Sequence, residues 1–551
     1  MLAVLVGGLM IGTAAASDDY LHRGIETGET APYALHPLGR EPAVNVDLWD
    51  VPPGDLPREA ERLREAGFRY ARQTFPWAEI EPSPDAFDWD RADAIVAALG
   101  GVGIQPIAVL AVSPDWAREP GAEAAVDAAP LELDAFGVYV GAFLEHFGGR
   151  VGTVQVWDHP NDPVRWGGEA PSAVDYGALL AVAANAARSA APAPAPVRVV
   201  LAELAPAPDG GATDLVFLDA LYRSGARPFF DVVAAVVDGG ARSPFDRRVE
   251  PERTNLSRTV LFRELMLDQG DGEKPVWATH FGWAAGGPTG VGAASQAEFV
   301  VTGLDRAREE WPWLGLAVAW AWAADGPEDP AADYALVGPG GTEAPLLAEL
   351  SGRAASADVA PPGWVPPGTR GEQPLALAYD GQWSDVGIGE SASGRRTTSQ
   401  VGAAVTVRFT GSGLNCVLRY GPRSGPVRVT LDGGPLPGSG ERAGDASLLY
   451  LDRFEALDVP VALAAGLEGG EHELRVELVE PGELTFGGAV VVRELPTLWP
   501  VVVLAGVGAL VIFFGLREGA YLFAQRGNFL PRRRAVELGR PLDGWQPTRR
   551  A

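Results

Sequence analysis

The sequence is poor in cysteine, in lysine and in positive charge. Cys416 is the single cysteine, so no disulfide can form within the chain, and we interpret it as a small buried side chain in a strand. Lys274 is the single lysine, and acidic residues outnumber basic ones by 72 to 44, which gives a formal net charge of −28. Because this charge repels a phosphate backbone, we expect no nucleic-acid partner.

The length and composition indicate several folded domains. A chain of 551 residues is too long for one ordinary domain, and a hydrophobic content of 47% is enough for real cores. We predict seven segments: 1–16, a signal peptide or N-terminal anchor; 17–42, an extracellular lead-in; 43–352, a barrel; 353–374, a linker; 375–495, a β-sandwich; 496–517, a transmembrane helix; and 518–551, a basic cytoplasmic tail.

Two apolar runs point to a membrane. The first, residues 1–16, ends in three alanines before Ser17, as a secretory signal does, but it has no basic residues at its start. The second, residues 498–516, is long enough to span a hydrocarbon core of about 30 Å. Arginines are frequent after it, so we expect the tail in the cytoplasm and the acidic bulk outside.

Residues 43–352 alternate apolar runs with amphipathic helical patterns. The runs are continuously apolar, as strands of a parallel sheet covered on both sides are. Eight β/α units of this kind predict a (β/α)8 TIM barrel, whose active site lies at the carboxyl ends of the strands. The predicted strands are 43–48, 68–73, 105–111, 151–157, 197–201, 232–237, 276–279 and 316–322.

Residues 375–495 follow a period of two instead. Val405, Val407 and Phe409 alternate with more polar neighbours, and the strand pattern near 427–431 ends in the turn Asp432-Gly433. Short alternating strands with glycine-rich turns predict an all-β jelly-roll sandwich. The runs 409–413, 427–433 and 469–474 resemble those of galactose-binding-like modules, which either bind sugar or act as spacers.

Two segments at the ends of the fourth and seventh predicted strands carry the strongest motif. Residues 155–161 read Gln-Val-Trp-Asp-His-Pro-Asn, and residues 274–283 read Lys-Pro-Val-Trp-Ala-Thr-His-Phe-Gly-Trp. Together with 66–77, 87–89 and 114–117, they resemble retaining clan A glycosidases, especially glycoside hydrolase family 39 and the neighbouring family 5 cellulases. In those enzymes the two strings read roughly W-N-E-P-N and W-x-T-E-F-G-W.

The resemblance implies that the two catalytic glutamates are replaced here by His159 and His280. A retaining mechanism needs two carboxyl groups about 5–5.5 Å apart. An imidazole at the acid/base position, His159, is still able to donate a proton. An imidazole at the nucleophile position, His280, gives a glycosyl adduct that stays cationic and offers no negative charge to the transition state.

The same resemblance assigns further positions of the cleft to substrate binding. Arg72 matches an arginine that supports the nucleophile, and Asp158 replaces an asparagine that binds the sugar 2-hydroxyl. Trp320 and Trp322 both lie in the last predicted strand, and one of them is expected to pack inside the barrel. The predicted substrate-binding residues are Arg72, Trp157, Asp158, Asn161, Asp238, Trp283 and Trp320.

These observations predict a membrane-anchored, extracellular, glycosidase-like protein that binds or organises polysaccharide without cleaving it. An active hydrolase remains an alternative, with His159 as the acid and Asp158, Asp238 or Glu203 as a substitute carboxylate. A divalent metal held by the two histidines and these aspartates is a second alternative, although we expect neither metal nor cofactor. A third is a scaffold whose basic tail contacts cytoplasmic partners or anionic lipids.

Overall fold

The computed structural model describes most of the chain. The described residues are 2–28, 42–118, 128–168, 170–190, 197–207, 210–324, 326, 328–355, 364–365, 377–385, 395–437, 441–468, 470–495 and 499–528. Half of the predicted lead-in and most of the predicted linker and basic tail lie outside these residues.

Within the described residues, eight parallel strands form the first domain, in the order β5-β4-β3-β2-β1-β8-β7-β6. A parallel bridge between Val200 and Val232 joins the two ends of this sheet, so the barrel closes. The predicted TIM barrel is therefore confirmed. Its strands are β1 (Ala43–Asn45), β2 (Tyr70–Pro76), β3 (Gln105–Ala111), β4 (Thr153–Val156), β5 (Arg198–Val200), β6 (Val233–Asp238), β7 (Val276–Gly282) and β8 (Leu314–Ala319).

The last predicted strand, 316–322, is in fact two strands. β8 ends at Ala319, and β9 (Ala321–Ala323) pairs with β10 (Ala335–Gly338) in a separate small sheet. Trp320 lies between the two strands and is half-buried, whereas Trp322 is 5% exposed and packs edge-on against Phe68. The change of sheet therefore separates the two tryptophans.

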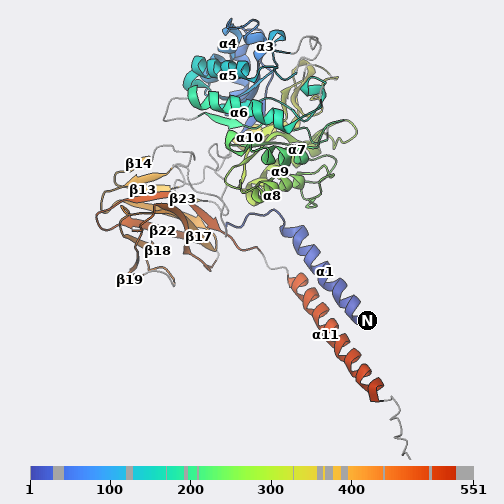
Figure 1. Ribbon diagram of the computed structural model, residues 1–551, viewed down its shortest axis with the longest axis vertical. Helices are drawn as coiled ribbons and strands as arrows, with labels where there is room; N and C mark the ends of the chain where they lie inside the picture. The colour runs from blue at the N-terminus through green and yellow to red at the C-terminus, as the bar shows by residue number, and fades with distance from the viewer. Residues whose placement is uncertain are drawn as a thin grey trace, which may run out of the picture. The chain divides into compact units, whose positions relative to one another are not determined.

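Helices surround the barrel (Figure 1), and their buried apolar residues belong to its core. In α2 (Leu56–Glu65), for example, Leu56, Ala60 and Leu63 are buried at a spacing of four and three residues, which is one face of a helix. The other long barrel helices are α4 (Asp90–Gly101), α5 (Leu133–Phe147), α6 (Ala173–Ala190), α7 (Asp214–Arg223), α8 (Val260–Asp268), α9 (Ala293–Glu310) and α10 (Pro345–Ala355).

The second domain consists of two further sheets, as the period of two predicted. One holds β16 (Ala404–Thr410), β22 (Glu471–Leu478) and β18 (Val427–Leu431), and the other holds β17 (Gly413–Tyr420) and β23 (Leu484–Val492). These neighbours pair antiparallel. Cys416, Val405 and Val407 are among the fully buried side chains of their shared core. Cys416 is thus a buried strand residue, as predicted.

Among the described residues, two helices are long and apolar enough to cross a membrane, judged by length and composition. They are α1 (Leu2–His22) and α11 (Trp499–Asn528). The second continues well past the predicted limit at residue 517, because Arg517 and Glu518 are followed by further good helix formers. These two helices form a separate unit of the chain.

Candidate active site at the mouth of the barrel

The ends of β4, β5 and β7 bring two histidines to one buried carboxylate. Glu203, three residues after β5, is 1% exposed. Its Oε1 lies 3.0 Å from His159 Nε2, just beyond β4. The same carboxylate lies 2.7 and 2.8 Å from His280 Nδ1, within β7. The two histidines predicted to occupy the catalytic positions are thus joined through a third residue.

The backbone after β4 is folded tightly to achieve this. Trp157 and His159 both have positive φ angles, 69° and 46°, which non-glycine residues seldom adopt. Asp158 forms a parallel bridge with Glu203, and the His159 amide donates to the Glu203 carbonyl oxygen at 2.9 Å. These bonds extend the pairing of β4 with β5 and hold the strained turn.

Arg72 of β2 forms hydrogen bonds with three side chains of the site. Its guanidinium donates to Gln155 at 2.9 Å, to Asn45 at 2.9 Å and to Asp158 Oδ1 at 3.0 Å. Arg165 Nη2 lies 3.5 Å from the other Asp158 oxygen. Arg72 therefore forms an ion pair with Asp158.

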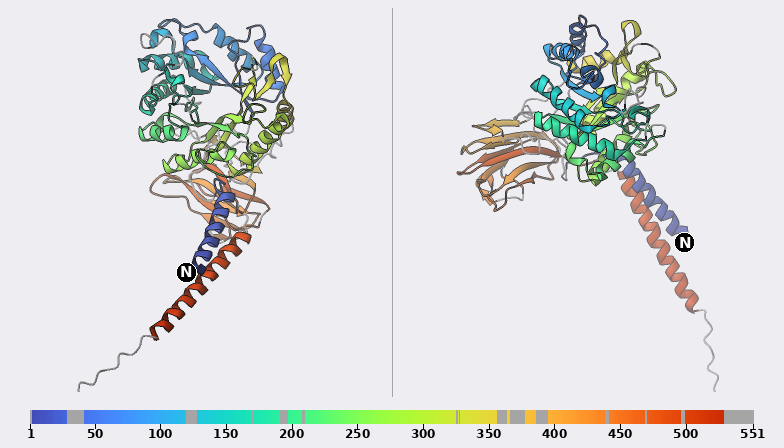
Figure 2. Two further views of the ribbon diagram at one scale, coloured as in Figure 1. Left: turned by 90° about the vertical axis from the view of Figure 1, so that its right-hand side faces the viewer. Right: turned by 45° about the horizontal axis from the view of Figure 1, so that its top comes forward.

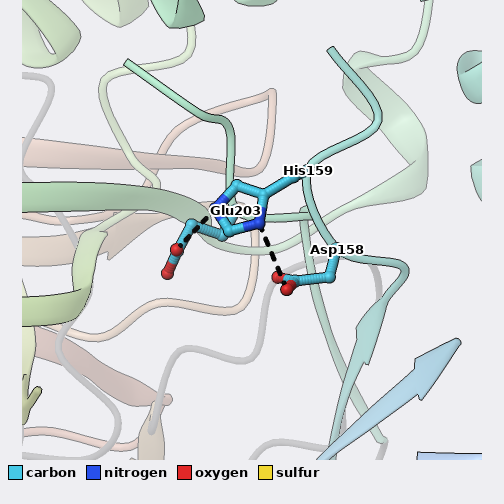
Figure 3. A group of neighbouring side chains, drawn as sticks. All are labelled: Asp158, His159 and Glu203. Atoms are coloured by element: carbon cyan, nitrogen blue, oxygen red, sulfur yellow. Dashed lines mark ion pairs between the residues drawn. The ribbon is translucent and has the colours of Figure 1, made fainter. Parts of the chain in front are cut away.

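His159 lies between two carboxylates. Figure 3 shows its ring with Glu203 on one side and Asp158 on the other, where Nδ1 is 3.3 Å from Asp158 Oδ2. Burial opposes the charged imidazolium, but the two carboxylates outweigh this and raise the pKa of His159 to about 10. The ring is therefore protonated at neutral pH.

The carboxylates respond in the opposite direction. Burial alone would raise the pKa of Glu203, but the charge of His280 and the hydrogen bonds from both histidines hold it well below its ordinary value. Asp158 behaves alike, since burial is outweighed by the charge and hydrogen bond of His159 and by the charge of Arg72, and its pKa is lowered. Both carboxylates therefore carry a negative charge at neutral pH.

Asp158, His159 and Glu203 also have the residue types of a metal site, with ligand atoms within 4.8 Å of one another. The fit is poor, because Asp158 faces one ring nitrogen and Glu203 faces the other. An ion bound to one nitrogen would leave the carboxylate at the opposite nitrogen without a share in it. This geometry suits a bridging imidazolium better than a metal ion.

A second group of side chains lies next to His280. Trp320 is tilted against the His280 ring at 5.1 Å and stacks on Tyr334 at 4.0 Å. The Tyr334 hydroxyl is 3.2 Å from Asp238 Oδ2, at the end of β6, and the Gly240 amide donates to Asp238 Oδ1 at 2.8 Å. Burial raises the pKa of Asp238 despite these two hydrogen bonds.

Four of the residues predicted to bind substrate are buried, and Arg72 is one of them. Trp157 and Trp283 are each 1% exposed, and the Trp283 ring nitrogen donates to the Arg242 carbonyl oxygen at 2.7 Å. Asn161 is fully buried, and its side chain bonds to Ala205 and Ala212. In this structure the two tryptophans offer no stacking face, and Asn161 holds the loop after β5.

Two residues of the site were not among the predicted site residues. Glu203 was named only as a substitute carboxylate, although its place just after the fifth predicted strand puts it at the mouth of any barrel. Tyr334 lies in the loop between β9 and β10, and no sequence pattern marks it.

No protein-family model and no curated protein matches the chain. Solved structures that are similar include a family 39 glycoside hydrolase from Bacteroides cellulosilyticus WH2 (14% identity, 82% of this chain and 83% of that chain, TM-score 0.46). A glucosidase from Croceicoccus marinus (14%, 81% and 98%, 0.45) and a family 39 enzyme from Xanthomonas axonopodis pv. citri (15%, 82% and 96%, 0.43) are also similar. These TM-scores lie below 0.5, so the fold of this chain follows from its own strand order.

Proposed function

We propose that the protein is a membrane-anchored, extracellular, glycosidase-like protein that binds carbohydrate at the mouth of its barrel and does not hydrolyse it. The observation that carries this proposal is the burial of Glu203 and the contact of its carboxylate with both histidines. Its carboxylate is buried and both of its oxygens are within hydrogen-bond distance of imidazoles. A nucleophile or base needs a free lone pair directed at substrate, and this carboxylate has its oxygens committed to the protein.

The protonation of His159 supports the same conclusion. A general acid works best when its pKa is near the working pH, and the pKa of His159 is about 10. Its two ring nitrogens, each protonated in the imidazolium, face Asp158 and Glu203 respectively. Both of these carboxylates are charged. Donation to a glycosidic oxygen would leave the buried Glu203 and the half-buried Asp158 without the positive charge between them.

Carbohydrate binding is supported by the second group of side chains. The stacked pair of Trp320 and Tyr334 is half-buried, and Asp238 lies beside it as a hydrogen-bonding group. Aromatic rings next to a few fixed polar groups are typical of small-molecule sites. We place the sugar against this pair and the exposed edge of His280.

A binding assay on the full chain tests the proposal. We expect the protein to be retained by one or more polysaccharides of a surface panel, and the variant Trp320→Ala to lose most of this retention. Phe245→Ala is the matched control, because Phe245 is 63% exposed elsewhere on the barrel. Retention by no polysaccharide, or equal loss in both variants, would contradict carbohydrate binding at this mouth.

The alternative of an active hydrolase rests on Glu203 as a carboxylate within the mouth. Release of reducing sugar by the wild-type protein, abolished in Glu203→Gln and in His159→Ala, would establish it. We expect no release from the wild-type protein on any polysaccharide that it binds.

A further inference from the structure

We propose that α1 remains in the mature protein as a second membrane helix and pairs with α11 in an antiparallel hairpin. This inference extends the membrane anchoring of the proposed function and is independent of what the barrel binds. The two helices lie side by side in both views of Figure 2.

Each helix turns a seam of less exposed residues toward the other. The seams have the spacing of three and four residues that is typical of paired helices. In α1 the seam is Ala3, Gly7, Met10, Ala14 and Ser17, and in α11 it is Val501, Leu504, Gly508, Val511 and Gly515.

Small residues let the two backbones meet. A methyl group added to Gly508 would lie 2.8 Å from the Gly7 carbonyl oxygen, and one added to Gly515 would lie 2.6 Å from the Ala3 Cβ. Residue 7 thus faces 508 while residue 3 faces 515, so the helices run antiparallel. Close approach at small residues is how membrane helices gain packing contacts where the hydrophobic effect supplies none.

The outward faces of both helices are apolar. Leu2 and Leu9 of α1 are 76% and 72% exposed, and Val503 and Phe514 of α11 are 58% and 52% exposed. Large side chains exposed in this density need a lipid environment or a partner. The apolar run of α1 is short for a lone span, so the contacts with α11 supply stabilisation that it would otherwise lack.

One orientation in the membrane suits both helices. Asp18 and Asp19 stand at the end of α1 that lies beside the start of α11, and Arg517 stands toward the opposite end of the pair. The positive-inside rule places Arg517 in the cytoplasm and the two aspartates outside. The N-terminus of α1 is then cytoplasmic.

The competing possibility is removal of α1 as a signal peptide after the alanines at 14–16. Mass spectrometry of the full chain purified from membranes decides between them. We expect the mature protein to retain residues 2–22. A mature N-terminus that follows Ala16 would overturn the proposal.

Cysteine cross-linking tests the pairing itself. The variant that combines Ala3→Cys with Gly515→Cys, oxidised in membranes, is expected to form a disulfide in most chains, because these positions are in contact. The control combines Gly8→Cys with Gly515→Cys, since Gly8 has nothing within 4 Å, and it should show little cross-linking. Cys416 is buried in the sandwich and adds no competing thiol at the helices.

Non-reducing gel electrophoresis of the uncleaved protein shows whether the link is within one chain, because a link between chains gives a species of at least twice the mass. A protease site inserted between barrel and sandwich shows that the link joins the two ends of the sequence, because the two fragments then stay together until reduced. Adding Gly508→Leu should abolish the cross-link, whereas Gly506→Leu, which points into open space, should leave it. Equal cross-linking in the test and control pairs, or a link found only between chains, would overturn the hairpin.

Discussion

His159 and His472 are two of the histidines that pair with carboxylates, and their pairs differ in the exposure of the acid. The side chains of His159 and His472 are 22% and 14% exposed, so the bases themselves are similarly covered. Glu203 beside His159 is 1% exposed, whereas Asp432 beside His472 is 49% exposed. The distances are alike, at 3.0 and 2.8 Å.

The comparison indicates that the exposure of the carboxylate determines how much such a pair contributes to the free energy of unfolding. Water screens the charge of an exposed acid and also solvates it when the partner is removed. A buried acid has neither benefit, so its loss or the loss of its partner leaves an uncompensated charge in the barrel. The mouth of the barrel and the surface of the sandwich should therefore respond very differently to equivalent substitutions.

The largest effect is expected from Glu203→Gln. This change removes a buried negative charge that faces both His159 and His280. Removing one partner of a buried ion pair typically lowers the free energy of unfolding by about 3 kcal/mol or more. We expect the free energy of unfolding of the barrel to fall by about that amount. Urea unfolding of the full chain, followed by tryptophan fluorescence, measures it because most tryptophans lie in the barrel. An unchanged midpoint would show that the cluster contributes nothing to stability.

The next effect depends on pH and is tested by His159→Gln. The pKa of His159 is raised from 6.5 to about 10, so its contribution to stability is full below pH 6.5 and is lost as the pH rises to about 10. The pKa values of Glu203 and Asp158 are lowered, so their contribution is lost as the pH falls below 4.5 and 3.8.

We therefore expect the free energy of unfolding of the wild-type protein to exceed that of His159→Gln by about 2 kcal/mol near pH 6. This difference should disappear near pH 10. Unfolding midpoints of both proteins across this range measure it. A difference that grows above pH 7 would mean that His159 is neutral in the folded protein.

The sequence predicted the barrel well because its signal is local. Buried parallel strands read as apolar runs, and the ends of the fourth and seventh runs mark where His159 and His280 must lie. The conformation of the chain beyond those strand ends depends on contacts between residues that are distant in sequence. The positive φ of Trp157 belongs to a turn that β5 stabilises, and its ring is buried rather than presented to a ligand.

The pairing of His159 and His280 with carboxylates could not be predicted from the sequence for a related reason. Which histidine nitrogen faces which carboxylate depends on three strand ends and on side-chain directions that no periodicity records. The sandwich shows the same limit, because its period of two predicts the sheets but not the pairing of His472 with Asp432.

The smallest effect is expected from Asp432→Asn, the surface counterpart of the Glu203 substitution. Asp432 accepts from the Glu473 amide at 2.8 Å and lies 2.8 Å from His472 Nδ1, and these hydrogen bonds outweigh burial and lower its pKa. An asparagine keeps an acceptor oxygen and is solvated, so the free energy of unfolding should fall by at most about 1 kcal/mol. Raising the salt concentration should shrink this loss further, because screening acts on exposed charges, while the loss in Glu203→Gln should stay nearly constant. If the losses of unfolding free energy in Glu203→Gln and Asp432→Asn fall equally with salt, solvent screens the mouth of the barrel as strongly as the surface of the sandwich. The contrast between the two histidine pairs then does not hold.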